Sequence, residues 1–129
     1  MEQTIKFNEY IQPIEIVKSL VPTNVDATIV GWGYRNLKTS LIARYLWKNT
    51  ARILHPNDCQ NYHQSIIYDN QFCALSENGG TCHGDSGGPF IWNNKLIGLV
   101  SWGIPCASGV PDVFTNVNHH LDFINSIIN

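Results

Sequence analysis

Charged residues are scarce in this chain. Only 14% of the 129 residues are Asp, Glu, Lys or Arg, and the formal net charge is −2. Without a basic excess the chain has no electrostatic means of holding nucleic acid or an acidic membrane surface, so we expect neither as a partner. No apolar run approaches the roughly 20 residues of a transmembrane helix. The 43% hydrophobic fraction instead predicts a globular domain, and this length predicts a single one.

Metal-binding patterns and processing signals are also missing. The four cysteines contain no Cys-x-x-Cys pair and no histidine cluster accompanies them, so disulfides are favoured over the rival metal site. Nothing in the sequence indicates another cofactor. Met1-Glu2-Gln3 is not followed by the apolar core of a signal peptide, and no Asn-x-Ser/Thr acceptor occurs. Disulfides belong to oxidising compartments, so their coexistence with a missing signal peptide indicates an incomplete chain.

The order of apolar and turn-forming residues predicts an all-β protein. An extended segment over 1–22 contains Pro13 and Pro22, which oppose helix. Periodicity alone leaves 41–48 open between strand and helix, and its flanking turn signals favour strand. About six short antiparallel strands with a C-terminal helix predict one closed barrel. Strands are expected at 27–32, 41–48, 71–75, 90–92, 95–102 and 113–117, a short helix at 56–62 and a terminal helix at 119–128.

The segment Gly84-Asp85-Ser86-Gly87-Gly88-Pro89, two residues after Cys82, carries the clearest chemistry. A serine hydroxyl is a weak nucleophile that needs a base and donors for the oxyanion it creates. The glycines permit positive φ and close approach to a substrate, and the N–H groups of Gly84 and Ser86 are placed to form an oxyanion hole. Taken alone, Gly-x-Ser-x-Gly also fits a glycine-rich surface turn.

The whole segment Cys82–Pro89 resembles the nucleophile motif of the chymotrypsin/trypsin family of serine endopeptidases. Four further stretches agree with that family in its own order: residues 7–14, 28–33, 100–103 and 111–117. The similarity covers nearly the whole chain. It implies proteolysis of protein or peptide substrates through an acyl-enzyme at Ser86, without metal or cofactor.

The family's catalytic histidine and aspartate have no counterpart here. Neither an Ala-Ala-His-Cys nor an Asp-Ile-Ala-Leu context is present, and none of the five histidines replaces them. The resemblance is thus to the C-terminal half of a protease, with 1–22 as the segment between two barrels and 23–129 as the second barrel. The absent first barrel is the implied structural partner, and we expect the isolated chain to be inactive or nearly so.

The resemblance also assigns a substrate pocket beside Ser86. Trypsin-like members carry an aspartate six residues before the nucleophile, whereas this chain has Gly80. Asp112 enters from the opposite wall, where a carboxylate would still favour cations, unless it is only a turn residue after Pro111. This combination resembles collagenolytic and chymotrypsin-like proteases of invertebrates, which accept basic and large apolar side chains. The substrate-binding residues implied are Gly80, Thr81, His83, Ser101, Trp102, Gly103 and Asp112, and the oxyanion donor is Gly84.

Asp85 has an activation role in the family, where its carboxylate pairs with an ammonium group freed by cleavage. No such ammonium is available in this sequence, and an unpaired buried carboxylate is costly. We therefore predict that Asp85 turns outward or bonds to local N–H groups, with an imperfect oxyanion hole as the result.

The resemblance selects one cysteine pairing of the three possible, Cys59–Cys73 with Cys82–Cys106, and it implies an extracellular protein. We expect His83 at the pocket rim, His55 and His63 on the surface around the short helix, and His119 with His120 at the start of the final helix.

Two other functions compete with an endopeptidase. A non-catalytic homologue would bind peptides or protease inhibitors through the same pocket. An α/β-hydrolase also has a Gly-x-Ser-x-Gly turn, but it needs a helix directly after the serine. Pro89 and the strand expected at 90–92 oppose that helix.

Overall fold

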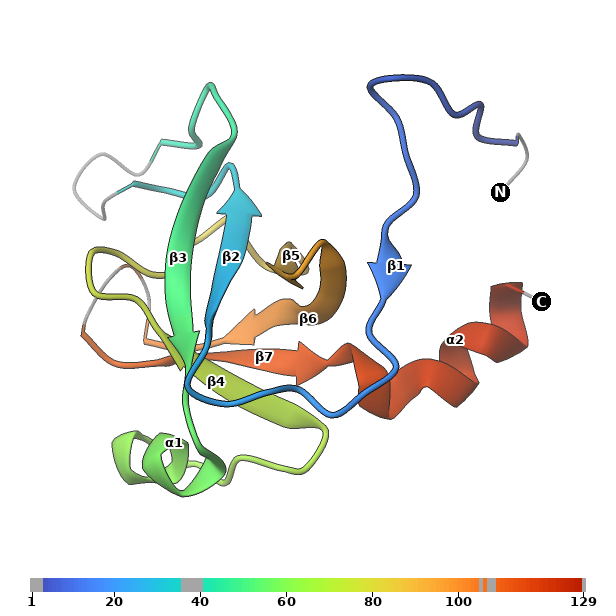
Figure 1. Cartoon of the computed structure of the whole chain (residues 1–129). Helices are drawn as coiled ribbons and strands as arrows, with labels where there is room; N and C mark the ends of the chain where they lie inside the picture. Colours follow the sequence, from blue (N-terminus) through green and yellow to red (C-terminus); the bar gives the residue numbers. More distant parts are fainter. Residues whose placement is uncertain (1–3, 36–40, 105, 107–108, 129) are drawn as a thin grey trace.

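The computed structural model describes residues 4–35, 41–104, 106 and 109–128, and within them six antiparallel strands close into a barrel. The strands follow the order β6-β5-β2-β3-β4-β7, and a β6–β7 pairing completes the ring (Figure 1). This arrangement confirms the barrel expected from the sequence. The strands are β2 (Asp26–Gly31), β3 (Trp47–Ile53), β4 (Gln71–Leu75), β5 (Pro89–Trp92), β6 (Lys95–Trp102) and β7 (Asp112–Asn116).

A further strand, β1 (Glu15–Ile16), pairs in parallel with the start of β6. The N–H of Val17 donates to the carbonyl of Leu96 over 3.0 Å, and Val17 is 2% exposed. The segment expected as an extended linker therefore also contributes a two-residue strand and a core residue to the barrel. Residues 1–3 of that segment lie outside the described residues.

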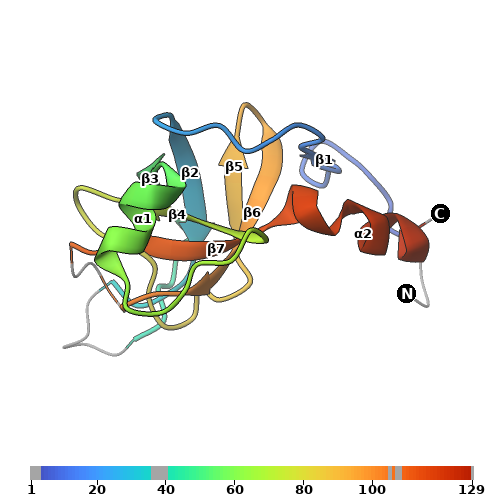
Figure 2. The ribbon, with the colours of Figure 1, turned by 90° about the horizontal axis from the view of Figure 1, so that it is seen from below.

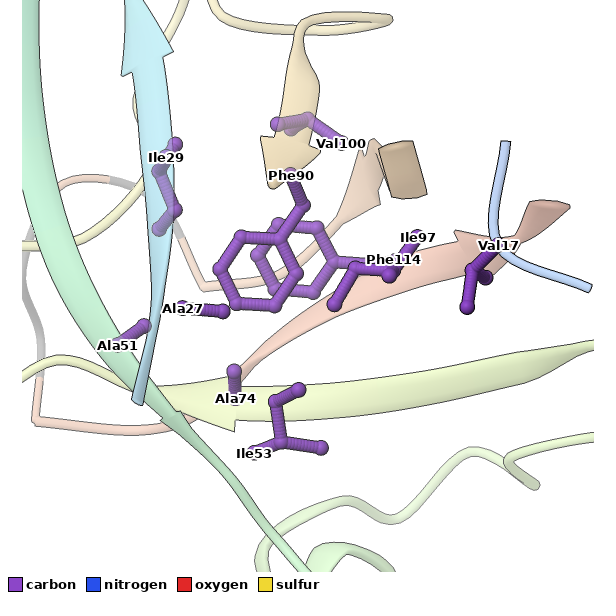
Figure 3. Packing of buried hydrophobic residues seen from close by; sticks show 10 residues of the cluster. All are labelled: Val17, Ala27, Ile29, Ala51, Ile53, Ala74, Phe90, Ile97, Val100 and Phe114. Atoms are coloured by element: carbon purple, nitrogen blue, oxygen red, sulfur yellow. The ribbon is translucent and has the colours of Figure 1, made fainter. Parts of the chain in front are cut away.

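The core is built around two fully buried phenylalanines, Phe90 on β5 and Phe114 on β7. Their rings stack with centroids 4.4 Å apart, and Figure 3 shows them at the centre of the surrounding aliphatic side chains. Phe72 stacks on both, and a Cβ at Gly98 would lie 2.6 Å from its Cζ atom. Full burial of one such side chain is worth about 1.5–3 kcal/mol.

The first helix, α1 (Pro56–Tyr62), matches its sequence prediction. The ring of His55 caps it by accepting from the N–H of Asn57, and Pro56 occupies the first turn, where its missing N–H is not needed. The Cys59–Cys73 disulfide, one of the two expected, joins the helix to β4.

The C-terminal segment begins as a 3₁₀ turn, η1 (Val117–His120), and continues as α2 (Leu121–Ile128). Both views show α2 projecting from the barrel (Figures 1 and 2), and none of its residues is buried. None of the helices in the described part of the chain has the length and apolar character that crossing a membrane requires.

The strand expected at 41–48 is wrong in position. Residues 41–46 form no strand, and β3 begins only at Trp47. Inside β3 the alternation that faces the core is carried by Ala51 and Ile53, each 1% exposed, among polar neighbours. The more apolar residues 41–46 contain several exposed side chains. Hydrophobicity therefore predicted the start of the strand too early in the chain.

Candidate active site

Ser86 lies on a tight turn that is fastened to β6. The N–H of Gly87 donates to the carbonyl of Val100 over 2.9 Å, and the N–H of Val100 donates to the carbonyl of Gly88 over 2.9 Å. Gly84 and Gly87 have φ values of +98° and +77°, which glycine adopts without strain. The turn thereby presents Ser86 as an exposed side chain.

A cavity of about 150 Å³ opens beside this serine. It brings together most of the residues that the sequence assigned to substrate binding, and it adds Val100 to them. Gly80 instead lines a second cavity, described below. The lining residues are Thr81, Cys82, His83, Ser86, Val100, Ser101, Trp102, Gly103 and Asp112.

Asp112 supplies a buried carboxyl group to this cavity. The residue is 5% exposed, and its Oδ2 accepts the N–H of Thr81 over 2.6 Å. Burial raises the pKa of Asp112 above its ordinary value, and the nearby Asp85 adds to that rise. The N–H and hydroxyl of Thr81 and the side chain of His63 act in the opposite direction. The carboxyl does not point to solvent, as a simple turn residue would.

Gly103 leaves room for that carboxyl group. A Cβ at this position would lie 2.5 Å from Oδ1 of Asp112, closer than real Cβ contacts. Glycine is therefore required here by close approach, and the pocket wall stays open.

The second expected disulfide, Cys82–Cys106, is also present and lies next to the pocket. The N–H of Cys106 donates to the carbonyl of Thr81 over 2.9 Å. The segment before the nucleophile is thus tied to the opposite loop by one covalent bond and one hydrogen bond.

Asp85 is held by main-chain donors. Its Oδ1 accepts the N–H of Gly33 over 2.8 Å, and its Oδ2 accepts the N–H of Cys82 over 3.0 Å. The carboxylate occupies the space where Gly31 and Gly33 lack a Cβ, since an added Cβ at either position would collide with it. Of the two alternatives predicted for Asp85, the structure has bonding to N–H groups. The imperfect oxyanion hole stays a prediction.

A second cavity, of about 250 Å³, has Asp85 in its lining. Gly80 lines it rather than the Ser86 pocket, together with the polar side chains of Asn49 and Asn78. Arg35 also lines it and stacks its guanidinium group 4.0 Å from the centre of the Trp47 ring.

His63 is not the surface residue that the sequence analysis expected. It is 9% exposed, and its ring meets Trp102 edge to face with centroids 5.0 Å apart. The neighbours Tyr62 and Gln64 are exposed, and the burial of His63 depends on Trp102 of the distant strand β6. The residues around His63 therefore carry no sequence signal of this burial. His55 is exposed, as expected.

His83 lines the Ser86 cavity and packs its ring against Tyr34, with centroids 5.8 Å apart. Across the described residues no hydrogen bond connects the Ser86 hydroxyl to an imidazole. The same part of the chain holds no group of three His, Cys, Asp or Glu side chains placed to bind a metal ion.

A protein-family model described as Trypsin matches residues 1–124. Hypodermin-A of Hypoderma lineatum is 35% identical over 123 residues, which cover 92% of this chain and 48% of that protein. Chymotrypsin-2 of Vespa crabro is 35% identical, with 96% and 57% covered, and Trypsin II-P29 of Gallus gallus is 34% identical, with 99% and 53% covered. The chain therefore spans about half the length of the curated relatives it matches.

Among solved structures, neuropsin, a serine protease expressed in the limbic system of mouse brain, superposes with a TM-score of 0.90. The two sequences are 26% identical, and the superposition covers 96% of this chain and 57% of the other.

Proposed function

The chain belongs to the trypsin family of serine proteases, and on that basis we propose that it carries the nucleophile and the specificity pocket of a serine endopeptidase. This proposal is supported by one observation: the exposed Ser86 and the buried Asp112 line the same cavity. A substrate side chain that enters the cavity brings its own carbonyl group next to the serine hydroxyl.

The chemistry then follows from the serine. Its Oγ bonds to the carbonyl carbon and loses its proton to a general base, which passes the proton to the departing amine as the peptide C–N bond breaks. Water hydrolyses the resulting ester and restores the hydroxyl. The N–H groups of Gly84 and Ser86 would stabilise the oxyanion.

We further propose that the histidine and aspartate of this reaction lie in a segment outside the present sequence. In support, no imidazole among the described residues bonds to Ser86, and the matched relatives are about twice as long. In this proposal 1–22 connects two barrels and 23–129 is the second. Loss of the base costs about six orders of magnitude in turnover, or about 8 kcal/mol of barrier, so the isolated chain would be nearly inactive.

The missing barrel would cover apolar side chains that this chain leaves exposed. Phe7 and Tyr10 of the N-terminal segment are 57% and 87% exposed, and Phe123 and Ile127 of α2 are 68% and 71% exposed. Both elements lie at the same end of the molecule (Figures 1 and 2). Exposed apolar surface of this kind marks an interface.

The cavity of about 250 Å³ beside Asp85 would receive the ammonium group of an activation cleavage. Asp85, Asn49 and Asn78 line it, and the oxygens of a carboxylate and of amide side chains can accept hydrogen bonds from an ammonium group. An ammonium group there would compensate the carboxylate charge and order the turn that carries Gly84.

The substrate preference we propose is for cationic side chains, with large apolar ones also accepted. Asp112 provides the negative charge, and Trp102 with the open Gly103 wall provides apolar surface. The two disulfides favour an extracellular location, where protein substrates and protease inhibitors are the expected partners.

A serine-directed fluorophosphonate tests the catalytic assignment. We expect rapid labelling in a longer protein that carries this chain behind its first barrel, no labelling in its Ser86→Ala variant, and labelling of the isolated chain at least about 10³-fold slower. Stoichiometric labelling of the isolated chain would contradict the external base. The missing imidazole contact also favours a second candidate, a non-catalytic homologue that binds peptides. A longer protein that binds benzamidine but resists labelling would support it.

A further inference from the structure

A further cavity, of about 270 Å³, is separate from the Ser86 pocket, and the two have no lining residue in common among those described. The chain that enters β2, the start of α1 and strand β4 surround it, at the end of the barrel where Figure 1 shows α1. Most of the residues that line it are apolar. A dry cavity of about 150 Å³ is enough to hold benzene, so this one has room for two fused rings.

The walls of this cavity are held in place by a disulfide and by main-chain hydrogen bonds. Cys59 and Cys73, which are bonded to each other and 1% exposed, both line it. The N–H of Leu54 donates to the carbonyl of Cys73 over 3.0 Å, and the N–H of Asn24 donates to the carbonyl of Ile53 over 2.7 Å. The cavity is therefore preformed, as small-molecule sites usually are.

The rim of the cavity carries exposed apolar side chains and one charge. Leu20 is 85% exposed and Tyr68 is 63% exposed, so a ligand between them would remove apolar surface from water. Asp69 is the one charged residue among the described lining residues, and its carboxylate disfavours an anionic ligand. The side-chain oxygen of Gln71 already accepts the N–H of Tyr68 over 3.2 Å, so it is not free to bind a ligand.

One buried atom of the lining, Oδ1 of Asn116, has no hydrogen-bond partner. Asn116 is the N-cap of η1, where an asparagine oxygen commonly accepts a helix N–H, yet its side chain makes no such bond. Its backbone is fixed, because its N–H donates to the carbonyl of Asn70 over 2.8 Å. A buried acceptor without a partner is costly, and a ligand N–H that bonds to Oδ1 would remove that cost.

We propose that this cavity is a second ligand site, which binds an uncharged fused-ring aromatic molecule with one N–H donor, of the indole class. The N–H of the ligand donates to Oδ1 of Asn116, and its rings pack between Leu20, Tyr68 and the buried disulfide. The apolar lining supplies most of the affinity, and the single acceptor selects ligands that carry a donor. The site is independent of the serine chemistry, so this proposal does not rest on the proposed protease function.

The test compares indole with 1-methylindole, which has nearly the same rings but no N–H. NMR titration of the isotope-labelled 129-residue chain measures both affinities and locates the ligand. We expect indole to bind with a Kd below about 1 mM and to shift the methyl signals of Ile53 and Ile67, which line the cavity. We expect 1-methylindole to bind at least about threefold more weakly, because it cannot donate to the acceptor.

Asn116→Leu keeps the approximate size of the side chain but has no acceptor, so the two ligands should then bind equally. Asn61→Leu, at an exposed asparagine of α1 that does not line the cavity, is the matched control and should keep the preference for indole. If Asn116→Leu melts early, Asn116→Ala, which also lacks the acceptor, replaces it with the same expected result.

Three results would overturn the proposal. The first is the absence of saturable indole binding, and the second is a preference for indole that persists in Asn116→Leu, since a steric effect of the methyl group would explain it. The third is binding in the Ser86 pocket, where the shifts would centre on Thr81 and Gly103. Gly103→Val, whose added side chain intrudes on that pocket, distinguishes the sites, and we expect it to bind indole as the unmodified chain does.

Discussion

The backbone N–H of Thr81 donates to Oδ2 of Asp112 over 2.6 Å, with both residues buried. This contact connects the segment before the nucleophile to the first residue of β7, 31 positions later in the chain. It holds the carboxyl group in the pocket but does not fully replace the lost hydration, because burial remains the largest influence on the pKa of Asp112.

The raised pKa of Asp112 predicts a pH dependence of stability. The folded chain binds this proton more tightly than the unfolded chain, so the free energy of unfolding falls as pH rises from about 3.8 through the raised pKa. Asp112→Asn removes that contribution and should flatten this part of the profile. Urea unfolding between pH 3.5 and 7 measures it, with Asp122→Asn on exposed α2 as the control. Parallel profiles for Asp112→Asn and the unmodified chain would contradict the assignment.

Gly103→Val should fill the pocket and displace Asp112. The new Cβ would lie 2.5 Å from Oδ1, and the branched side chain would project further. We expect benzamidine affinity to fall more than about tenfold and the free energy of unfolding to drop by about 1–3 kcal/mol. Thr50→Val, at an exposed position of β3, should change stability by less than about 0.5 kcal/mol. Unaltered benzamidine binding by Gly103→Val would show that this cavity is not the ligand site.

Gly33→Ala should destabilise the chain through Asp85. The added methyl group collides with the carboxylate, which must leave its two N–H donors. We expect a loss of about 1–3 kcal/mol in urea unfolding. In an Asp85→Ala background the collision partner is gone, so the same substitution should cost much less, and a double-mutant cycle measures the difference. Additive effects would place the strain elsewhere.

Phe114→Ala should lower the free energy of unfolding by about 3–5 kcal/mol. The side chain is fully buried and stacks on Phe90 and Phe72, so its removal leaves a cavity bounded by three strands. Phe123→Ala deletes the same atoms from a residue that is 68% exposed and should cost less than about 0.5 kcal/mol. Equal losses in the two variants would contradict the core described here.

Local sequence predicted those elements whose signals are themselves local. Asn93 and Asn94 both adopt positive φ, at 48° and 59°, as a two-residue hairpin turn between β5 and β6 requires. The strand at 71–75 and the helix at 56–62 also have the predicted bounds. The nucleophile turn was recognisable for the same reason, since glycines at fixed offsets determine its backbone.

The remaining features depend on tertiary contacts. The core-facing positions of β3, Ala51 and Ile53, stand among polar residues, so the strand is identified by its pairing with β2 and β4. Similarly, β1 exists because Lys95 and Leu96, which pair with β5 on one side of β6, lie before the β7 pairing begins at Gly98 on the other side. The burial of His63 requires Trp102, which is 39 residues away in the chain, and no pattern around His63 indicates it.

The Cys82–Cys106 bond ties together loops beside the pocket, whereas the phenylalanine core lies elsewhere and includes none of the four cysteines. If the pocket binds ligands as proposed, its competence and the phenylalanine core depend on different bonds. In a reducing environment the barrel could persist while the walls around Asp112 separate, so the oxidation state of one thiol pair would decide whether a folded molecule recognises a ligand at all.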